Sequence, residues 1–227
     1  SSRANLRIDR WLAIMMRTPH TLYLADQQLV FSDIDKDGGL QTVLSVGLDE
    51  EGYDKKFDEF LSQHKPEAIA VFVDLMSEEI KHESIPHING KDRKLLLDRK
   101  FKALFSSADL TWTQHVCREK TGRRDDVYLL TGISLPVQVQ RIFDILSQTQ
   151  QKVVGVFSMP ILQQRLNLVL PDNKQYLLIS RVLGSHTHTN TFRQAYYKDR
   201  RLVVCRVNTV SASSGKEEFD QLFDEIE

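Results

Sequence analysis

Short apolar runs of strand length alternate with amphipathic segments along most of the chain. Three extended runs come first, at 21–25, 28–32 and 41–46. The polar pair Asp26 and Gln27 separates the first two runs, as in a tight hairpin. Apolar residues at helical spacing follow over Tyr53–Leu61, and this helix is expected to end before Pro66. The opening pattern therefore predicts a β-β-β-α unit.

The central part of the chain predicts buried strands joined by helices. Continuous apolar runs, typical of strands covered on both faces, occur at 68–75, 126–133 and 152–157. Helical spacing is present in 92–105, after Pro136, and again after Ser158 and Pro160. Between the first of these strands and Asn89 the sequence is polar, and we expect a connection there without regular structure.

The opening pattern returns near the C-terminus. Three extended runs at 175–180, 191–197 and 201–207 precede a helical pattern that includes Phe219 and Phe223. The two helices even share similar sequences, KKFDEFL at 55–61 and EEFDQLF at 217–223. Both ends thus read β-β-β-α, roughly 155 residues apart. Such a duplication, with βα elements between the copies, predicts the α/β class and an actin-like (duplicated ribonuclease-H-like) fold; a coincidence of short strands in another α/β fold is the alternative.

This duplication gives a domain scheme. Residues 1–19 are predicted to form an N-terminal docking helix, with a membrane-surface helix as the alternative. Residues 20–170 are predicted to form the first ribonuclease-H-like subdomain, with inserted βα elements, and residues 171–227 the start of a second one. Because the chain stops at Glu227 within a helical pattern, we expect the second half to be incomplete and the chain to be a fragment.

Composition narrows the class of protein. The 227 residues carry a formal net charge of −1, which does not point to nucleic acid or an anionic membrane. Cys117 and Cys205 lie far apart and outside any CxxC pattern, which favours a reducing compartment over a disulfide or zinc framework. No apolar run approaches the ~18–20 residues of a transmembrane helix.

Candidate phosphate-binding residues lie between the first two strands of the second unit. Gly184, Ser185, Thr187, Thr189 and Asn190 supply one glycine and several hydrogen-bonding groups. A solvated hairpin loop is the favoured interpretation. The corresponding turn of the first unit has no glycine, and Gly215-Lys216 is followed by Glu217 where a P-loop requires Ser or Thr. We therefore expect no enzyme activity and no cofactor, with ATP and Mg²⁺, and weak ATPase activity, as the alternative.

Metal and nuclease chemistry find little support in the sequence. His186 and His188 could share one face of a strand, but no third ligand lies near them. Asp26 and Asp74 follow or end predicted strands, as in two-metal nucleases, but no further carboxylate is specified by the pattern. We expect no metal site and no catalytic residues. No GxSxG sequence is present either.

Charge is concentrated in one segment. Residues 91–124 contain ten Lys or Arg against four acidic residues. Within it Arg118, Lys120, Arg123 and Arg124 are candidates for contact with an acidic protein partner. A solvated surface is the simpler interpretation, and RNA binding is a further alternative.

Several stretches resemble a known group of bacterial proteins. They are the segment from Arg93 to Arg124 and the runs VYLLTGI, GVFSMPIL, QYLLISRVLG, TFRQAYYKDRRL and CRVN. These are similar to actin-like cytoplasmic proteins of type IV pilus and type II secretion assembly, the PilM-like and GspL-like group. The resemblance covers roughly Ala68 to the end of the chain.

The resemblance implies a cytoplasmic protein located at the inner membrane, or the cytoplasmic part of an inner-membrane protein, that recruits other assembly components. Self-association is an open alternative for this chain. Some members bind ATP, but Ser180-Arg181-Val182 stands where their second phosphate loop has an Asp-x-Gly pattern. We therefore expect a non-enzymatic scaffold or recruitment protein of a pilus or secretion machine. A nucleotide-binding actin-like switch is the first alternative, and a nucleic-acid-binding module using residues 91–124 is the second.

Overall fold

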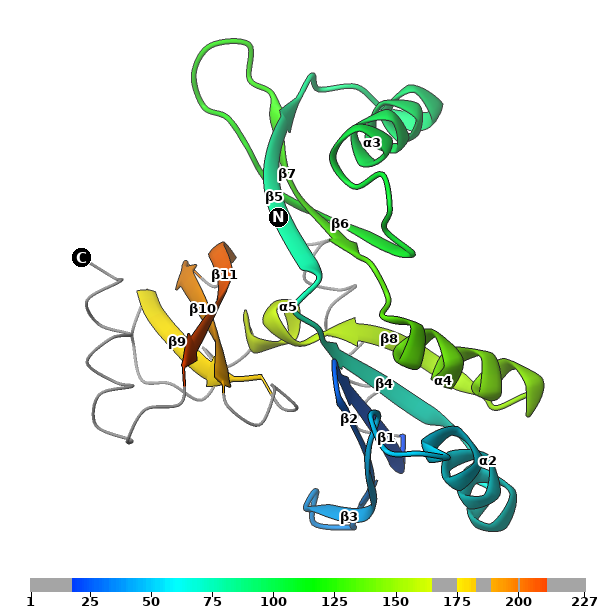
Figure 1. The fold of residues 1–227 in the computed structure, drawn as a ribbon. Coiled ribbons are helices and arrows are strands. Elements are labelled where there is room, and N and C mark those ends of the chain that lie inside the picture. Colours follow the sequence, from blue (N-terminus) through cyan, green and yellow to red (C-terminus); the bar gives the residue numbers. More distant parts are fainter. Residues whose placement is uncertain (1–17, 165–174, 183–188, 200, 212–227) are drawn as a thin grey trace. The chain divides into compact units, whose positions relative to one another are not determined.

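The computed structural model describes residues 18–164, 175–182, 189–199 and 201–211 (Figure 1). The chain divides into two compact units. Unit 1 comprises Ser1–Met76 and Pro136–Glu227, and unit 2 comprises Ser77–Leu135. Unit 2 is thus a single insertion into the chain of unit 1. No helix in the described part of the chain is long and apolar enough to cross a membrane.

A five-stranded mixed sheet forms the centre of unit 1. Its order is β3-β2-β1-β4-β8, with β1 (His20–Ala25), β2 (Gln28–Ile34), β3 (Leu40–Gly47), β4 (Ile69–Asp74) and β8 (Val153–Ser158). The first three strands form an antiparallel meander, whereas β1, β4 and β8 run parallel. Leu22, Leu24, Val71 and Val73 are register partners on one face of the sheet and are fully buried there.

Helices α2 (Tyr53–His64) and α4 (Val137–Gln148) lie side by side on one face of this sheet (Figure 1). Phe57 and Leu61, four residues apart, form the buried face of α2. The short helix α5 (Met159–Gln163) follows β8 directly. Ser158 caps it by accepting a hydrogen bond from the Ile161 N–H, and Pro160 stands in its first turn.

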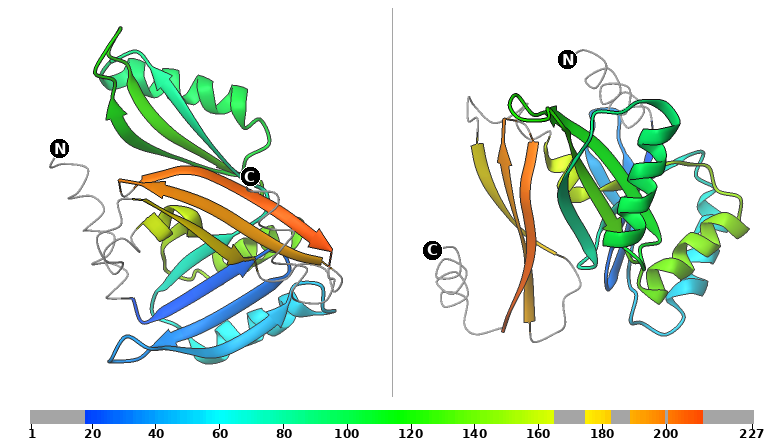
Figure 2. Two further views of the ribbon diagram at one scale, coloured as in Figure 1. Left: turned by 90° about the vertical axis from the view of Figure 1, so that its left-hand side faces the viewer. Right: turned by 90° about the horizontal axis from the view of Figure 1, so that it is seen from above.

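The second sheet of unit 1 is an antiparallel meander. Figure 2 shows its three strands in gold and orange, β9 (Gln175–Arg181), β10 (Thr189–Lys198) and β11 (Arg201–Ser211). Its order β11-β10-β9 matches the order β3-β2-β1 of the first meander. Together with the mixed five-stranded sheet, this arrangement confirms the predicted α/β fold class. The helix predicted around Phe219 and the docking helix predicted over 1–19 lie outside the described residues, apart from residues 18 and 19.

Unit 2 consists of one antiparallel sheet and one helix. Strands β5 (Glu78–Ile85), β6 (Leu110–Arg118) and β7 (Asp126–Ile133) are ordered β5-β7-β6, and α3 (Gly90–Leu104) lies against the sheet (Figure 2). Its core contains Ile85, Phe105, Tyr128 and Leu130, with apolar residues of α3 packed around them.

Strand β5 corrects the sequence analysis, which expected a connection without regular structure up to Asn89. The strand has the sequence EEIKHESI, with only two apolar residues, and it occupies an edge of the sheet. It pairs along its whole length with the apolar strand β7. An edge strand half exposed to solvent needs no continuous apolar run, so hydropathy did not reveal it.

We expect Gly132→Ala to destabilise unit 2. A Cβ at this position would lie 2.5 Å from the Phe105 ring, which packs directly over β7. Such a clash in a packed core costs about 1–3 kcal/mol, measurable by chemical denaturation of the full chain. The double variant Gly132→Ala/Phe105→Leu should recover part of that loss, and strictly additive effects would contradict the packing of Phe105 on Gly132.

Candidate functional site

Polar residues gather at the carboxyl ends of the parallel strands of unit 1. Asp26 follows β1, Asp74 ends β4 and Ser158 ends β8. Ala25 and Asp74 are register partners, so β1 and β4 end at the same level of the sheet. Ligands of open α/β sheets bind at this edge. This edge is therefore the candidate location of a functional site.

An arginine from the other sheet occupies this edge. Arg193 of β10 is fully buried, and its Nε donates to Asp74 Oδ1 at 2.9 Å. One terminal nitrogen of the guanidinium donates to the Leu75 carbonyl at 2.7 Å. The Tyr23 hydroxyl donates to the second carboxylate oxygen, Asp74 Oδ2, at 2.8 Å. Both oxygens of Asp74 therefore accept hydrogen bonds.

Further contacts join the three-stranded sheet to α5 and to Gln164 just after it. The Tyr197 hydroxyl donates to the Pro160 carbonyl at 2.9 Å, and the Leu202 N–H donates to Gln164 Oε1 at 3.2 Å. These are ordinary hydrogen bonds, whereas the Arg193–Asp74 pair carries full charges out of water. A charge in that position must be paired, because the desolvation cost of an unpaired ion is several kcal/mol. The cluster therefore fixes β10 against the end of β4.

Asp26 stands beside this pair. Burial raises the pKa of the Asp26 carboxyl above its usual value, although the hydrogen bond from the Met76 N–H and the charge of Arg193 both lower it. The carboxylates of Asp26 and Asp74 are those that the sequence suggested for two-metal chemistry. Here the cation against Asp74 is a guanidinium of the chain itself. The arrangement favours a structural ion pair over a pair of metal-binding carboxylates.

The residues proposed for phosphate binding are only partly described. Gly184, Ser185 and Thr187 lie outside the described residues, as do His186 and His188. Thr189 and Asn190 are the first two residues of β10, but their side chains also lie outside what the structure describes. Phosphate binding by this loop stays a prediction.

The four basic residues proposed for partner binding lie on the hairpin between β6 and β7, within unit 2. All four are exposed. Arg118 Nε donates to the Arg124 carbonyl at 2.9 Å, and Arg123 makes a bidentate pair with Asp125 at 2.7 and 2.8 Å. The hydrogen bonds from Arg123 lower the pKa of the Asp125 carboxyl. The side chains of Arg118 and Arg123 therefore hold the shape of the turn, although they too are exposed.

Neither a protein-family model nor a curated protein matches the chain. Its structure is similar to a chain of the PilM–PilN type IV pilus biogenesis complex, with a TM-score of 0.60 at 11% identity. The match covers 91% of this chain and 66% of that chain, just under two thirds of its length.

The chain has the fold of that pilus protein. Two further solved structures match with TM-scores below 0.5. One is a Bacteroides thetaiotaomicron protein of unknown function with an actin-like ATPase fold, at 0.48 and 10% identity, covering 92% of this chain and 76% of that one. The other is the cytoplasmic domain of EpsL, an inner-membrane component of the Vibrio cholerae type II secretion system, at 0.45 and 13% identity, covering 85% and 70%. The resemblance to PilM-like proteins predicted from the sequence is confirmed for the fold.

Arg193→Met should destabilise unit 1 strongly. The variant keeps most of the apolar volume of the side chain but leaves the Asp74 carboxylate buried without its cation, which costs about 3–5 kcal/mol in the free energy of unfolding. Arg201→Met is the matched control, because Arg201 is an exposed arginine at the start of the neighbouring strand β11, and it should change stability by about 0.5 kcal/mol or less. Equal effects of the two substitutions in urea titrations would contradict the role of the pair.

The raised pKa of Asp26 predicts a pH dependence of stability. The folded chain holds this proton to higher pH than the unfolded chain does, so the stabilising contribution is present at acid pH and is lost as pH rises through the raised pKa. Asp26→Asn cannot ionise and keeps an oxygen that can accept from the Met76 N–H. Its melting temperature should therefore gain on that of the wild type as pH rises from about 4 to 7. A difference that does not vary with pH would contradict this assignment.

Proposed function

We propose that this protein is a component of a bacterial envelope assembly machine, of the type IV pilus or type II secretion class, and that it recruits partner proteins without catalysis. The observation that carries the proposal is the fold shared with a chain of the PilM–PilN pilus biogenesis complex over 91% of the residues. That protein is described in complex with a second assembly protein, which is the kind of role we assign here.

The strand-end cluster supports the non-catalytic part of the proposal. The edge of the sheet where ligands of α/β folds bind contains the buried Arg193–Asp74 pair. A nucleotide with its Mg²⁺ would bring its own cation to such carboxylates, and Arg193 already supplies a positive charge to Asp74. This favours a scaffold over a nucleotide-dependent switch.

The β6–β7 hairpin supports the recruitment part. Its exposed Lys120 and Arg124 belong to a segment with ten basic and four acidic residues, at 91–124. Such a surface suits an acidic segment of a protein partner, because opposite potentials speed association and select the partner. The proposed location is the cytoplasm at the inner membrane, where the membrane is reached through the partner.

Charge reversal of this hairpin should weaken partner recruitment. We expect Lys120→Glu/Arg124→Glu to recover at least about tenfold less pilus or secretion assembly protein from bacterial membranes than the wild type, because two attractive contacts become repulsive. Recovered proteins are identified and quantified by mass spectrometry. Lys36→Glu/Lys55→Glu, an equal charge change at two exposed lysines of unit 1 outside this segment, is the matched control and should recover the wild-type amount.

The two parts of the proposal fail separately in this experiment. Equal recovery with both double variants would remove the hairpin as the docking surface while leaving the function in place. Recovery of no envelope assembly protein by the wild type would overturn the function itself. Recovery of nucleic acid that the hairpin variant alone loses, with steep dependence on salt, would favour the nucleic-acid-binding alternative.

Mg-ATP separates the scaffold from the nucleotide switch. A ligand bound only by the native state raises the melting temperature in a saturable way. We therefore expect millimolar Mg-ATP to leave the melting temperature of the full chain unchanged. A saturable rise of several degrees would favour the switch, and its loss on substitution of Ser185 and Thr187 would place the nucleotide at the predicted loop.

A further inference from the structure

Two histidines and one aspartate converge at the opposite end of β1 from Asp26. We propose that His20, Asp33 and His64 form a binding site for a divalent transition-metal cation of the zinc type. The proposal is independent of the proposed function. It also departs from the sequence analysis, which expected no metal site.

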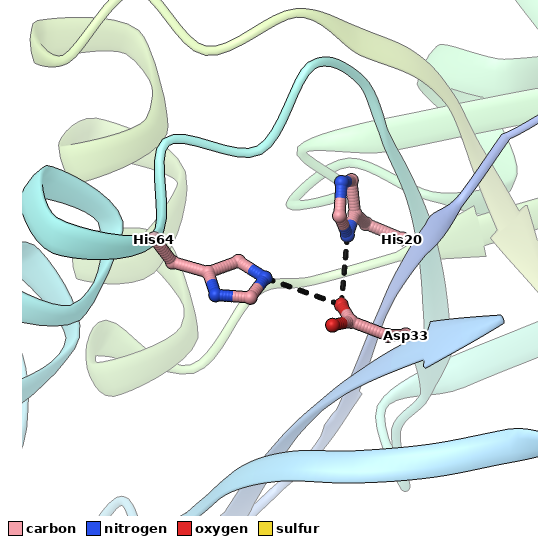
Figure 3. Close-up of side chains that lie close together, drawn as sticks. All are labelled: His20, Asp33 and His64. Carbon is pink, nitrogen blue, oxygen red and sulfur yellow. Dashed lines mark hydrogen bonds and ion pairs between the residues drawn. The ribbon is translucent and has the colours of Figure 1, made fainter. Parts of the chain in front are cut away.

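The three side chains come from three different elements and meet at one oxygen. His20 is the first residue of β1 and faces Asp33 as its register partner on β2, and His64 is the last residue of α2. His20 Nδ1 lies 2.8 Å and His64 Nε2 lies 3.2 Å from Asp33 Oδ1. Figure 3 shows both rings pointing toward this carboxylate. One ligand atom from each residue lies within 4.8 Å of the other two.

Packing holds the rings in place. The His64 ring stacks on Phe60, one turn earlier in α2, with 5.0 Å between centroids and 17° between planes. The fully buried Phe31 presents its ring to both imidazoles, at 5.7 Å from His20 and 5.6 Å from His64. A site whose ligands are fixed by neighbouring side chains loses little conformational freedom when a metal binds.

The ligand set suits zinc. Two neutral imidazoles and one carboxylate are common ligands of Zn²⁺, at about 2.0–2.2 Å from the ion, so neighbouring ligand atoms lie about 3.4 Å apart in a tetrahedral site. The observed separations of 2.8 and 3.2 Å to Asp33 Oδ1 are close to that value. The side chains are 15% (His20), 35% (Asp33) and 25% (His64) exposed, which leaves water access to a fourth coordination position.

Unit 2 contains a second group of two histidines and one aspartate, whose ligand atoms are arranged differently. In unit 2, His87 and His115 contact opposite oxygens of Asp126, with His87 Nδ1 2.8 Å from Oδ2 and His115 Nε2 3.4 Å from Oδ1. Both of these histidines are more than 40% exposed. Across the described ranges, only the group of His20, Asp33 and His64 brings three ligand atoms together closely enough for one ion. The unit 2 group therefore provides a matched control.

The test uses the full chain after treatment with a chelator. Titration with ZnCl₂ alone, followed by calorimetry and by melting temperature, should give one saturable site and a rise in melting temperature. CoCl₂ should give visible absorption of a four- or five-coordinate ion without the near-ultraviolet band of a thiolate, which distinguishes the site from Cys117 or Cys205. Absence of saturable binding of either ion would overturn the proposal.

Variants assign the binding to these residues. His20→Gln, Asp33→Asn and His64→Gln should each weaken zinc binding by at least about tenfold, because each removes one of three protein ligands. His87→Gln/His115→Gln and His186→Gln/His188→Gln should leave the zinc affinity unchanged. Zinc binding retained in the variant that combines all three substitutions, or lost in either control, would overturn the assignment. Circular dichroism of each metal-free variant establishes that it folds.

Discussion

The buried ion pair between Arg193 and Asp74 is the interaction on which unit 1 depends. It joins β10 of the three-stranded sheet to the last residue of β4, the central parallel strand of the five-stranded sheet. Neither charge can return to water without separating the sheets. Because an unpaired buried charge costs several kcal/mol, the two sheets stay together or unfold together. Burial also raises the pKa of the neighbouring Asp26 carboxyl, because a second negative charge is disfavoured at this end of the sheet.

This constraint shapes what the protein can do. Strand ends that serve as ligand sites in other α/β proteins here hold two parts of the chain together. The exposed basic hairpin and the histidine–aspartate group lie elsewhere, on unit 2 and at the amino end of β1 respectively. The fold itself is shared with a chain of the PilM–PilN complex.

The proposed metal site also joins separate elements of unit 1. His20 and Asp33 hold the ends of β1 and β2, and His64 holds the end of α2 to them. A cation at this point would replace hydrogen bonds by coordination and strengthen the junction of sheet and helix. The site would then contribute to the stability of the first β-β-β-α unit, away from the strand ends where substrates bind in such folds.

The sequence determined most local elements and, of the strand-end cluster, Asp26 and Asp74. Apolar runs and turn residues predicted the two antiparallel meanders and the helix α2, and the two-residue turn at Asp26-Gln27 fixes the register that places His20 opposite Asp33. Tertiary structure alone decided the rest. Strand β5 exists because β7 offers it hydrogen bonds, Arg193 meets Asp74 from 119 residues away, and His64 reaches Asp33 only after α2 packs on the sheet. Hydropathy and turn chemistry act between near neighbours, whereas these pairings depend on packing between segments whose separation in sequence carries no signal.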